Sequence, residues 1–377
     1  SYPMEQDFPA SPLGLYIHIP FCLSRCGYCS FFTLPFRNSA LNEYVDYVEK
    51  EKALYHSQLN RPIATIYFGG GTPSLLNAEQ IMRILSGLNI LPDAEITLEI
   101  NPLQITEKYL QALKTTPVNR LSIGLQSMNK EELNWLDRHH KPEQIQEKIA
   151  LCRQFGYQNI SLDLIYGLPN ATLQTLQKTV EKYLKLNPEH ISCYLLTLDE
   201  DCKLAKKNNS LPNEEMQAEQ YEFLCNCLKQ AGYIHYEISN FALPGFTAKH
   251  NLRYWHSDDY LSLGVSSTGW ISPVRYQNPA DLNLYYQSVD KGEAFPQKEE
   301  LSGQRIVQDY LMMGLRLKEG IDLDCFQKHF KFKLTELYGE KISKLQKIGM
   351  LSLTEHNLAL TEKALFVSNS VIGDLIL

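Results

Sequence analysis

The sequence has no hydrophobic run near the roughly 20 residues that a helix needs to cross a bilayer. It also has no excess of basic residues, because 36 Lys and Arg stand against 43 Asp and Glu, a formal net charge of −7. This balance argues against non-specific binding to nucleic acid or to anionic lipid. The first twelve residues are polar and acidic, so we expect no secretory signal in them.

Disulfide-forming cysteine patterns are missing as well. The nine cysteines are an odd number, and six of them are scattered: Cys152, Cys193, Cys202, Cys225, Cys227 and Cys325. A secreted disulfide framework would be smaller and denser in cysteine. We therefore expect a reducing compartment, the cytoplasm. With 377 residues, the chain is long enough for one large domain and a smaller one.

Short apolar runs alternate with helix-length segments between residues 15 and 198. The predicted strands are Leu15–Pro20, Ala64–Phe68, Ile96–Ile100, Leu121–Leu125, Ile160–Ile165 and Ile191–Leu196. The predicted helices are Leu41–Ser57, Asn77–Ser86, Thr106–Lys114, Lys130–Trp135 with Pro142–Phe155, and Thr172–Leu186. Buried parallel strands have this composition. This alternation of strands and helices predicts an α/β fold whose right-handed βα units close into a barrel or partial barrel.

The remaining sequence predicts a smaller second domain. Glu214–Ala231 is predicted as a helix, and Tyr233–Ala242 and the Gly/Ser-rich piece Gly264–Gly269 follow it. We assign residues 1–277 to the core, 278–298 to a linker and 299–377 to a C-terminal domain. In that domain the predicted helices are Gln304–Lys318 and Lys341–Ile348, and Met350–Leu353 and Leu358–Leu360 form a predicted hairpin around Thr354–Asn357. Helices followed by a hairpin predict a winged-helix-like fold.

Three cysteines follow the first predicted strand, in Cys22-Leu-Ser-Arg-Cys26-Gly-Tyr-Cys29. Thiolates at this spacing fit a loop around a [4Fe–4S] cluster. Because this loop has no fourth cysteine, one iron keeps an open position, which radical S-adenosylmethionine (SAM) proteins fill with the methionine group of SAM. A zinc knuckle or buried structural cysteines are the alternatives. Zinc usually takes four ligands, however, and no nearby Cys or His supplies an obvious fourth.

Glycine and polar residues occur where later strands end, which is where ligand chemistry gathers in βα barrels. Gly69-Gly70-Gly71 closes the second strand and lets backbone groups approach a ligand. The polar residues at these ends are Glu99, Gln126, Arg138 and Asp163. A carboxylate there can hold ribose hydroxyls, and an arginine can bind the carboxylate of SAM. Each residue alone could be a capping or surface residue, but their common location predicts a binding site.

Four motifs together resemble the oxygen-independent coproporphyrinogen III oxidase superfamily: Tyr16-Ile-His-Ile-Pro-Phe-Cys22, Phe68-Gly-Gly-Gly-Thr-Pro73, Leu121-Ser-Ile-Gly-Leu-Gln126 and Asp163-Leu-Ile-Tyr-Gly-Leu-Pro169. The resemblance covers nearly the whole chain. It implies a radical SAM partial (β/α)6 TIM-type barrel, a C-terminal winged-helix-like α+β domain, a [4Fe–4S] cluster and SAM. It also implies the SAM contacts, which are Tyr16, Tyr28 (through its carbonyl), Gly70, Gly71, Thr72, Glu99, Gln126, Arg138 and Asp163.

Two sequence features separate the chain from the oxidase itself. The oxidase has a further cysteine two positions after the third cluster ligand, where this chain has Phe31. His250-Asn-Leu-Arg-Tyr-Trp255 looks instead like the HNxxYW signature of HemW-type heme chaperones, which bind heme and pass it on. A neutral imidazole can ligate heme iron, and Tyr254 and Trp255 could cover a porphyrin face. On residue chemistry alone, His250 could also be a hydrogen-bonded loop histidine beside core aromatics.

The sequence therefore predicts a heme chaperone on a radical SAM scaffold, with heme, a heme-accepting protein and an electron donor as partners. The acceptor could be membrane-associated, although this chain has no membrane segment of its own. The alternative is an enzyme that oxidises the propionates of coproporphyrinogen III to vinyl groups. A DNA-binding regulator is disfavoured, because residues 299–377 hold ten Lys or Arg against eleven Asp or Glu. We expect no nucleic-acid partner.

Overall fold

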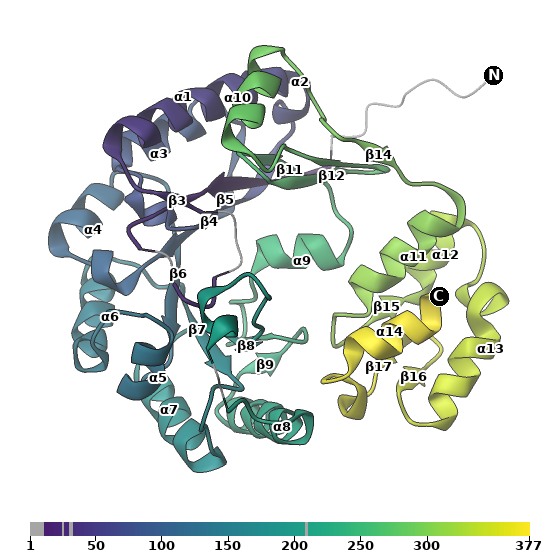
Figure 1. Ribbon diagram of the computed structural model, residues 1–377. Coiled ribbons are helices and arrows are strands. Elements are labelled where there is room, and N and C mark those ends of the chain that lie inside the picture. The colour runs from purple at the N-terminus through teal and green to yellow at the C-terminus, as the bar shows by residue number, and fades with distance from the viewer. Residues whose placement is uncertain (1–10, 25, 30–32, 208–209) are drawn as a thin grey trace, which may run out of the picture. The chain divides into compact units, whose positions relative to one another are not determined.

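The computed structural model describes residues 11–24, 26–29, 33–207 and 210–377 (Figure 1). The chain forms two compact units. Unit 1 is made of residues 1–25, 31–121 and 258–300, and unit 2 is made of residues 26–30, 122–257 and 301–377. Each unit therefore combines segments that are far apart in the sequence.

Unit 1 contains a sheet in which strand β1 (Leu13–Ile19) lies between two parallel neighbours. β4 (Ile63–Gly70) pairs with one edge of β1, and β11 (Tyr260–Leu263) pairs with the other. β5 (Ile90–Ile100) continues the sheet in parallel beyond β4. Beyond β11 the pairing becomes antiparallel, through β12 (Thr268–Ile271), β13 (Val274–Gln277) and β14 (Glu299–Glu300). A short separate pair joins β2 (Phe21–Cys22) to β3 (Leu34–Pro35).

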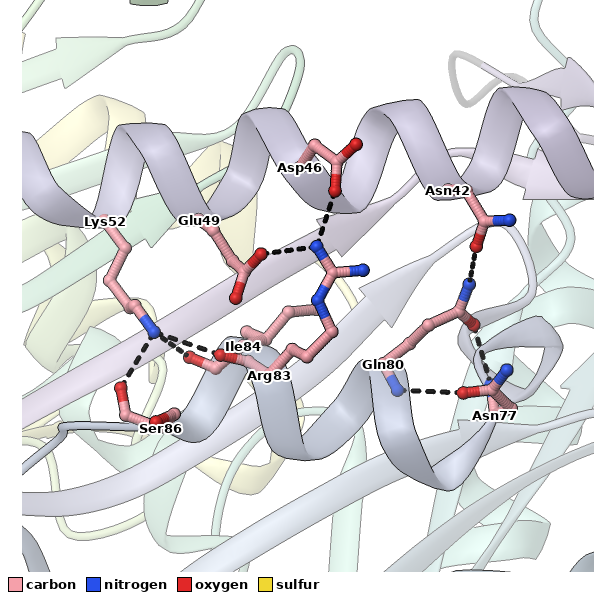
Figure 2. A network of polar contacts seen from close by, with 9 residues as sticks. All are labelled: Asn42, Asp46, Glu49, Lys52, Asn77, Gln80, Arg83, Ile84 and Ser86. Carbon is pink, nitrogen blue, oxygen red and sulfur yellow. Dashed lines mark hydrogen bonds and ion pairs between the residues drawn. The ribbon is translucent and has the colours of Figure 1, made fainter.

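The helices of unit 1 are α1 (Asn38–Leu54), α2 (His56–Leu59), α3 (Ala78–Leu85), α4 (Glu107–Leu113) and α10 (Leu282–Asp290), with 3-10 turns η1 (Pro73–Leu75) and η2 (Pro102–Gln104). A polar network joins α1 to α3 (Figure 2). Arg83 donates to the carboxylates of Asp46 and Glu49, each at 2.5 Å. Lys52 donates to carbonyls at the C-terminal end of α3, where a cation is favoured. The network thereby ties together the helices that precede β4 and β5.

Unit 2 contains the later βα units. β6 (Arg120–Gln126) lies beside β7 (Ile160–Tyr166), which pairs in parallel with β8 (His190–Leu195). β10 (Asn240–Ala242) and β9 (Ile234–His235) add antiparallel strands beyond β8. The helices and 3-10 turns of this part are α5 (Lys130–Trp135), η3 (Pro142–Gln144), α6 (Ile145–Gln154), α7 (Leu173–Lys185), η4 (Lys203–Lys206), α8 (Glu214–Gln230) and α9 (Lys249–Trp255).

The C-terminal part of unit 2 holds four further helices and a small sheet (Figure 1). These are α11 (Gly303–Gly314), α12 (Leu323–Phe330), α13 (Leu334–Lys347) and α14 (Ser368–Ile376), with β15 (Ile321–Asp322), β16 (Leu351–Leu353), β17 (Asn357–Leu360) and the turn η5 (Glu362–Ala364). The part is tied to the rest of the unit by a β-bridge between Glu237 and Leu317. Glu362 adds ion pairs to Lys229 at 2.8 Å and to Lys318 at 3.1 Å.

The predicted α/β fold is confirmed, because each of the six predicted strands corresponds to a strand: β1, β4, β5, β6, β7 and β8. The predicted C-terminal hairpin corresponds to β16 and β17, which pair antiparallel. The sequence did not predict β11, α12 or α14. α10 lies within residues 278–298, and the division of the chain into core, linker and C-terminal domain stays a prediction. No helix in the described ranges combines the length and the apolar character that a membrane span requires.

Candidate functional site

The first cysteine of the predicted cluster loop lies against the glycine motif, within unit 1. Thr72 Oγ1 is 3.6 Å from Cys22 Sγ, and the Thr72 amide donates to the Phe21 carbonyl at 2.8 Å. A Cβ on Gly71 would lie 2.8 Å from Cys22 Sγ. Only a residue without a side chain fits beside this sulfur, so the glycine motif forms part of the cysteine's surroundings.

Position 70 also requires glycine, but because of its backbone conformation. Its φ of +120° belongs to a region that side chains rarely allow. A Cβ there would also lie 2.7 Å from the Ile19 carbonyl oxygen and 2.9 Å from the ring of His18. The backbone of β4 can therefore run directly against the end of β1.

Tyr16 and Glu99 come from different strands of unit 1 and meet over Gly69. A Cβ on Gly69 would lie 2.5 Å from Glu99 Oε1 and 2.9 Å from the Tyr16 ring. The Tyr16 hydroxyl is 2.9 Å from Nδ1 of His18, a residue that the sequence analysis did not single out. Burial raises the pKa of Tyr16, and the nearby negative charge of Glu99 raises it further. A carboxylate from near the end of β5 and a neutral phenol from β1 thus lie together beside Gly69, where both can bind a polar ligand.

The second and third cysteines lie in a turn of unit 2. The Cys29 amide donates to the Cys26 carbonyl at 3.1 Å, which closes the turn around Tyr28. Tyr28 packs against a buried cluster that consists of Leu136, Ile165, Leu168 and Leu196. None of the three loop cysteines is in a disulfide, and each is half-buried. Neither thiol of this turn is therefore tied up in a disulfide.

Arg138 links this turn to two strands of unit 2. Its Nη1 donates to Cys26 Sγ at 3.4 Å, and its Nη2 donates to the carbonyl of Gly124 on β6. Burial lowers the pKa of Arg138, but the negative charges that Tyr28, Cys26 and Asp163 can carry raise it by more. Asp163 is half-buried on β7. The predicted residues Tyr28, Arg138 and Asp163 therefore share one electrostatic environment.

Gln126 ends β6 in a left-handed conformation, with φ of +67°. Backbone in this region is uncommon for a residue with a side chain and tends to occur at functional positions. Its amide group is close to Gly124, because Nε2 would be 3.5 Å from a Cβ on that glycine. The same Gly124 holds Arg138, so Gln126 lies beside the Arg138 guanidinium.

One contact of the cysteine turn had no signal in the sequence. The Leu204 amide donates to the Gly27 carbonyl at 3.0 Å, and the fully buried Leu204 side chain lies against Gly27. The carboxylate of Asp137 also lies close to Gly27, 2.9 Å from the position of a Cβ there, and pairs with Lys203 at 2.8 Å. The turn η4 therefore supports the cysteine turn, although about 175 residues separate them in sequence.

His250 lies on helix α9 rather than in a loop, and its side chain is 1% exposed. Its Nε2 is 2.7 Å from the hydroxyl of Tyr254, one helical turn later, and the two rings are nearly perpendicular. Trp255 lies under the guanidinium of Arg316, 4.6 Å from its ring centroid. The HNxxYW segment is therefore packed against α11 in the C-terminal part of unit 2.

The donor chemistry fits an iron–sulfur cluster. Three thiols in a loop that has no fourth cysteine suit a cluster with one open iron. Cys26 Sγ accepts a hydrogen bond, and hydrogen bonds to cluster sulfurs influence the reduction potential. The cysteines are divided between the units, Cys22 in unit 1 and the other two in unit 2. In the described part of the chain, no three His, Cys, Asp or Glu residues gather closely enough to hold a single metal ion. Phe31, which distinguishes the chain from the oxidase, lies outside the described residues.

Comparison with known proteins places this geometry in a family. The radical SAM superfamily matches residues 16–183, and the HemN C-terminal domain matches residues 301–367. The heme chaperone HemW of Lactococcus lactis subsp. lactis (strain IL1403) is 32% identical and aligns over 97% of this chain and 98% of its own length. HemW of Synechocystis sp. (strain ATCC 27184 / PCC 6803 / Kazusa) is 37% identical, over 82% of this chain and 79% of its own.

A solved structure of a radical SAM enzyme has the same fold. Coproporphyrinogen III oxidase (HemN) from Escherichia coli, described as a radical SAM enzyme, superposes with a TM-score of 0.85 at 26% identity, over 98% of this chain and 91% of that one. The radical SAM family implies a [4Fe–4S] cluster and SAM. Since relatives above 30% identity run nearly its full length, the chain belongs to the HemW-like members of the oxygen-independent coproporphyrinogen III oxidase family, within the radical SAM superfamily.

Proposed function

We propose that this protein binds heme and transfers it to an acceptor protein, on a radical SAM scaffold that carries a cluster and SAM. The observation that carries the proposal is the full-length similarity to proteins named heme chaperone HemW. The segment His250-Asn-Leu-Arg-Tyr-Trp255 supports it. An electron donor, a membrane-associated acceptor and a cytoplasmic location remain predictions.

In this proposal Cys22, Cys26 and Cys29 ligate the cluster. When bound, a reduced cluster and SAM would together supply the one-electron chemistry of radical SAM proteins. Arg138 would bind the SAM carboxylate, because its guanidinium lies 3.4 Å from Cys26 Sγ and is therefore beside the cluster loop. The remaining proposed SAM contacts are Tyr16, Tyr28, Gly70, Gly71, Thr72, Glu99, Gln126 and Asp163. The glycines leave backbone groups accessible, and the carboxylates of Glu99 and Asp163 accept from hydroxyl or amine groups.

His250 is the proposed heme ligand, and its surroundings define what ligation requires. Nε2 must leave the hydroxyl of Tyr254, and the 1% exposed ring must reach the porphyrin. Helix α9 therefore has to shift or partly open before heme binds there. This requirement favours slow, gated binding at His250 over simple surface binding.

The second candidate is coproporphyrinogen III oxidation, which the likeness to HemN supports. The two functions differ in a measurable product. The oxidase releases carbon dioxide from coproporphyrinogen III and consumes SAM, whereas the chaperone binds heme without decarboxylating this substrate.

The test is a heme titration of anaerobically reconstituted full-length protein, followed by the Soret band, with and without SAM. We expect saturable heme binding and no carbon dioxide from coproporphyrinogen III under reducing conditions. Transfer is then tested by mixing heme-loaded protein with an apo-heme protein and following the acceptor's spectrum. Protein that binds no heme, yet decarboxylates the substrate, would replace the chaperone proposal with the oxidase.

A further inference from the structure

Helix α9 carries His250 in its first turn and Tyr254 and Trp255 in its last turn. Heme iron can be ligated by His250 only when its Nε2 leaves the Tyr254 hydroxyl, 2.7 Å away. The end of α9 that gives way first therefore decides how the ligand becomes available. The two ends are held by different kinds of contact, one to the strands of unit 2 and the other to its C-terminal part.

The first end of α9 is fixed by a chain of buried hydrogen bonds. The Ala248 amide donates to the Tyr236 hydroxyl at 3.1 Å, and that hydroxyl is 2.6 Å from His190 Nε2. His190 Nδ1 is in turn 2.7 Å from Ser161 Oγ. Both His190 and Ser161 are buried, and they are paired residues of strands β8 and β7. Breaking such a chain is costly because its polar groups are buried, so this end of α9 stays anchored to the strands.

The last turn of α9 is held by a weaker contact. The Arg316 guanidinium lies 4.6 Å from the centroid of the Trp255 ring, and both side chains are half-buried. A cation–π contact contributes about as much as a single hydrogen bond, whereas three connected hydrogen bonds fix the first end. The last turn is therefore the end of α9 that opens more easily.

Glu237 fixes the position of Arg316. Its carboxyl group is buried, and burial raises its pKa. Two backbone amides, the Arg316 guanidinium and the Trp255 indole lie close enough to oppose this rise. The backbones are paired as well, through the bridge between Glu237 and Leu317 and through the Ile238 amide, which donates to the Arg316 carbonyl at 3.2 Å. A carboxylate that faces both partners thus keeps the cation over the indole.

Opening of the last turn would free His250 without displacing it. His250 is two residues from the anchored Ala248, so it keeps its place when the other end of the helix moves. Tyr254 directly precedes Trp255, so its hydroxyl leaves His250 Nε2 when the last turn unwinds. The contact between Trp255 and Arg316 therefore controls whether Nε2 is covered.

We propose that Arg316 is a positioning residue for heme binding, because it keeps the last turn of α9 closed over His250 until Trp255 separates from it. The proposal rests on the proposed heme function and names the contact that regulates the same site. Arg316 follows α11 in the C-terminal part of unit 2. A displacement of that part relative to α9 therefore changes access to His250.

The test compares hemin binding and amide hydrogen exchange in full-length, cluster-reconstituted protein. Arg316→Met removes the charge and keeps an apolar stem, and Arg316→Lys keeps a cation. Arg275→Met is the matched control, because Arg275 makes the same kind of contact with Trp270, at 4.9 Å, in unit 1. Glu237→Gln is made alone and together with Arg316→Met.

We expect Arg316→Met to raise the rate constant of hemin binding about three- to thirtyfold in stopped-flow mixing, the range that one cation–π contact covers. The amides of the last turn of α9 should exchange faster before hemin is added, while those of β7 and β8 keep the wild-type rate. Arg316→Lys should lie close to wild type, and Arg275→Met should match it. Glu237→Gln should speed binding in the wild-type background but not in Arg316→Met, because it acts through Arg316.

Three results would overturn the proposal, and they separate it from the proposed function. If wild-type protein binds hemin and Arg316→Met binds it at the same rate or more slowly, the role of Arg316 is wrong while heme binding stands. Faster exchange that extends to β7 and β8 would mean that Arg316 supports the whole unit rather than the last turn of α9, and this also contradicts the proposal. If wild-type protein binds no hemin, the proposed function fails and the role of Arg316 fails with it.

Discussion

The guanidinium of Arg138 donates from Nη1 to Cys26 Sγ across 3.4 Å, while its Nη2 is held by the carbonyl of Gly124. In the proposed site Cys26 is a cluster ligand, and a cation fixed beside it can act on two partners. It can bind the carboxylate of SAM at the neighbouring iron, and its N–H···S bond influences the cluster itself.

Replacing Arg138 by Ala should therefore weaken SAM binding. A hydrogen bond to a charged group contributes about 1.5–3 kcal/mol, and we expect a loss of that size in the binding free energy. Calorimetric titration of cluster-loaded protein measures it. Lys344→Ala, which removes an exposed cation from a surface ion pair, serves as the control and should not change the affinity. Equal affinity in Arg138→Ala would remove this residue from the SAM site.

Gly71→Ala should impair cluster assembly although it leaves all three cysteines in place. The added Cβ would lie 2.8 Å from Cys22 Sγ and 2.8 Å from the Phe21 carbonyl oxygen, so the sulfur or the backbone must move. Iron and sulfide content and visible absorbance after anaerobic reconstitution measure the effect, and Cys22→Ala sets the lower limit. Gly339→Ala is the control, because a Cβ there meets nothing within 4 Å. A normal cluster in Gly71→Ala would show that this contact is unimportant.

Tyr254→Phe should speed heme binding at His250. The substitution removes the hydroxyl that lies 2.7 Å from His250 Nε2 and keeps the perpendicular ring in place. His250→Ala should lose or greatly shift the corresponding Soret band, while cluster and SAM binding stay intact. Stopped-flow mixing with hemin measures both. Slower binding in Tyr254→Phe would mean that the Tyr254 hydroxyl assists ligation rather than competing with it.

Glu51 should make a contribution to stability that falls as the pH rises. It is buried in unit 1, and burial raises its pKa from an ordinary 4.5 to about 7, despite hydrogen bonds from Gly264, Tyr285 and Asn278. Between these pH values the folded state keeps a proton that the unfolded state has lost. The Glu51 contribution to the free energy of unfolding should therefore drop by roughly 3 kcal/mol between pH 4.5 and pH 7. Burial lowers the pKa values of His140 and His235 to about 4, and these histidines act in the opposite direction over this range.

Urea unfolding at a series of pH values measures this dependence. Glu51→Gln replaces the carboxyl group by a neutral group of the same shape, so this part of the pH dependence should disappear. Glu43→Gln, at an exposed position of the same helix, should leave the dependence unchanged. A stability difference between wild type and Glu51→Gln that stays constant over this range would contradict the assignment.

The parallel strands were predictable because each one carries its own signal, a short apolar run such as Ile160–Ile165 between helical segments. β11 was not predictable in this way. It has four residues, including the polar Ser262, and it is a strand because it pairs with β1, about 245 residues earlier. Distant pairing of this kind leaves no local pattern in a single sequence.

In the candidate site, too, some features have a local sequence signal and others depend on distant contacts. The position of the glycine motif at a strand end follows from the order of strands in a βα fold, and the sequence predicted it. Its contact with Cys22 is visible only in the structure. The burial of His250 does not follow from its motif, because it depends on α9 being helical and on the bond to Tyr254. The support of Gly27 by Leu204 likewise depends on a tertiary contact and left no sequence signal.

The parallel pairing of β1 with β11 has a consequence for biosynthesis. One edge of β1 is covered by β4, which is synthesised soon afterwards, but the other edge has no partner until Leu263 has been translated. Unit 1 therefore finishes folding only after residues 122–257 have been made. A nascent or truncated chain that ends before Tyr260 exposes the backbone N–H and C=O groups of an open strand edge next to the first cluster cysteine, and such edges pair readily with other chains.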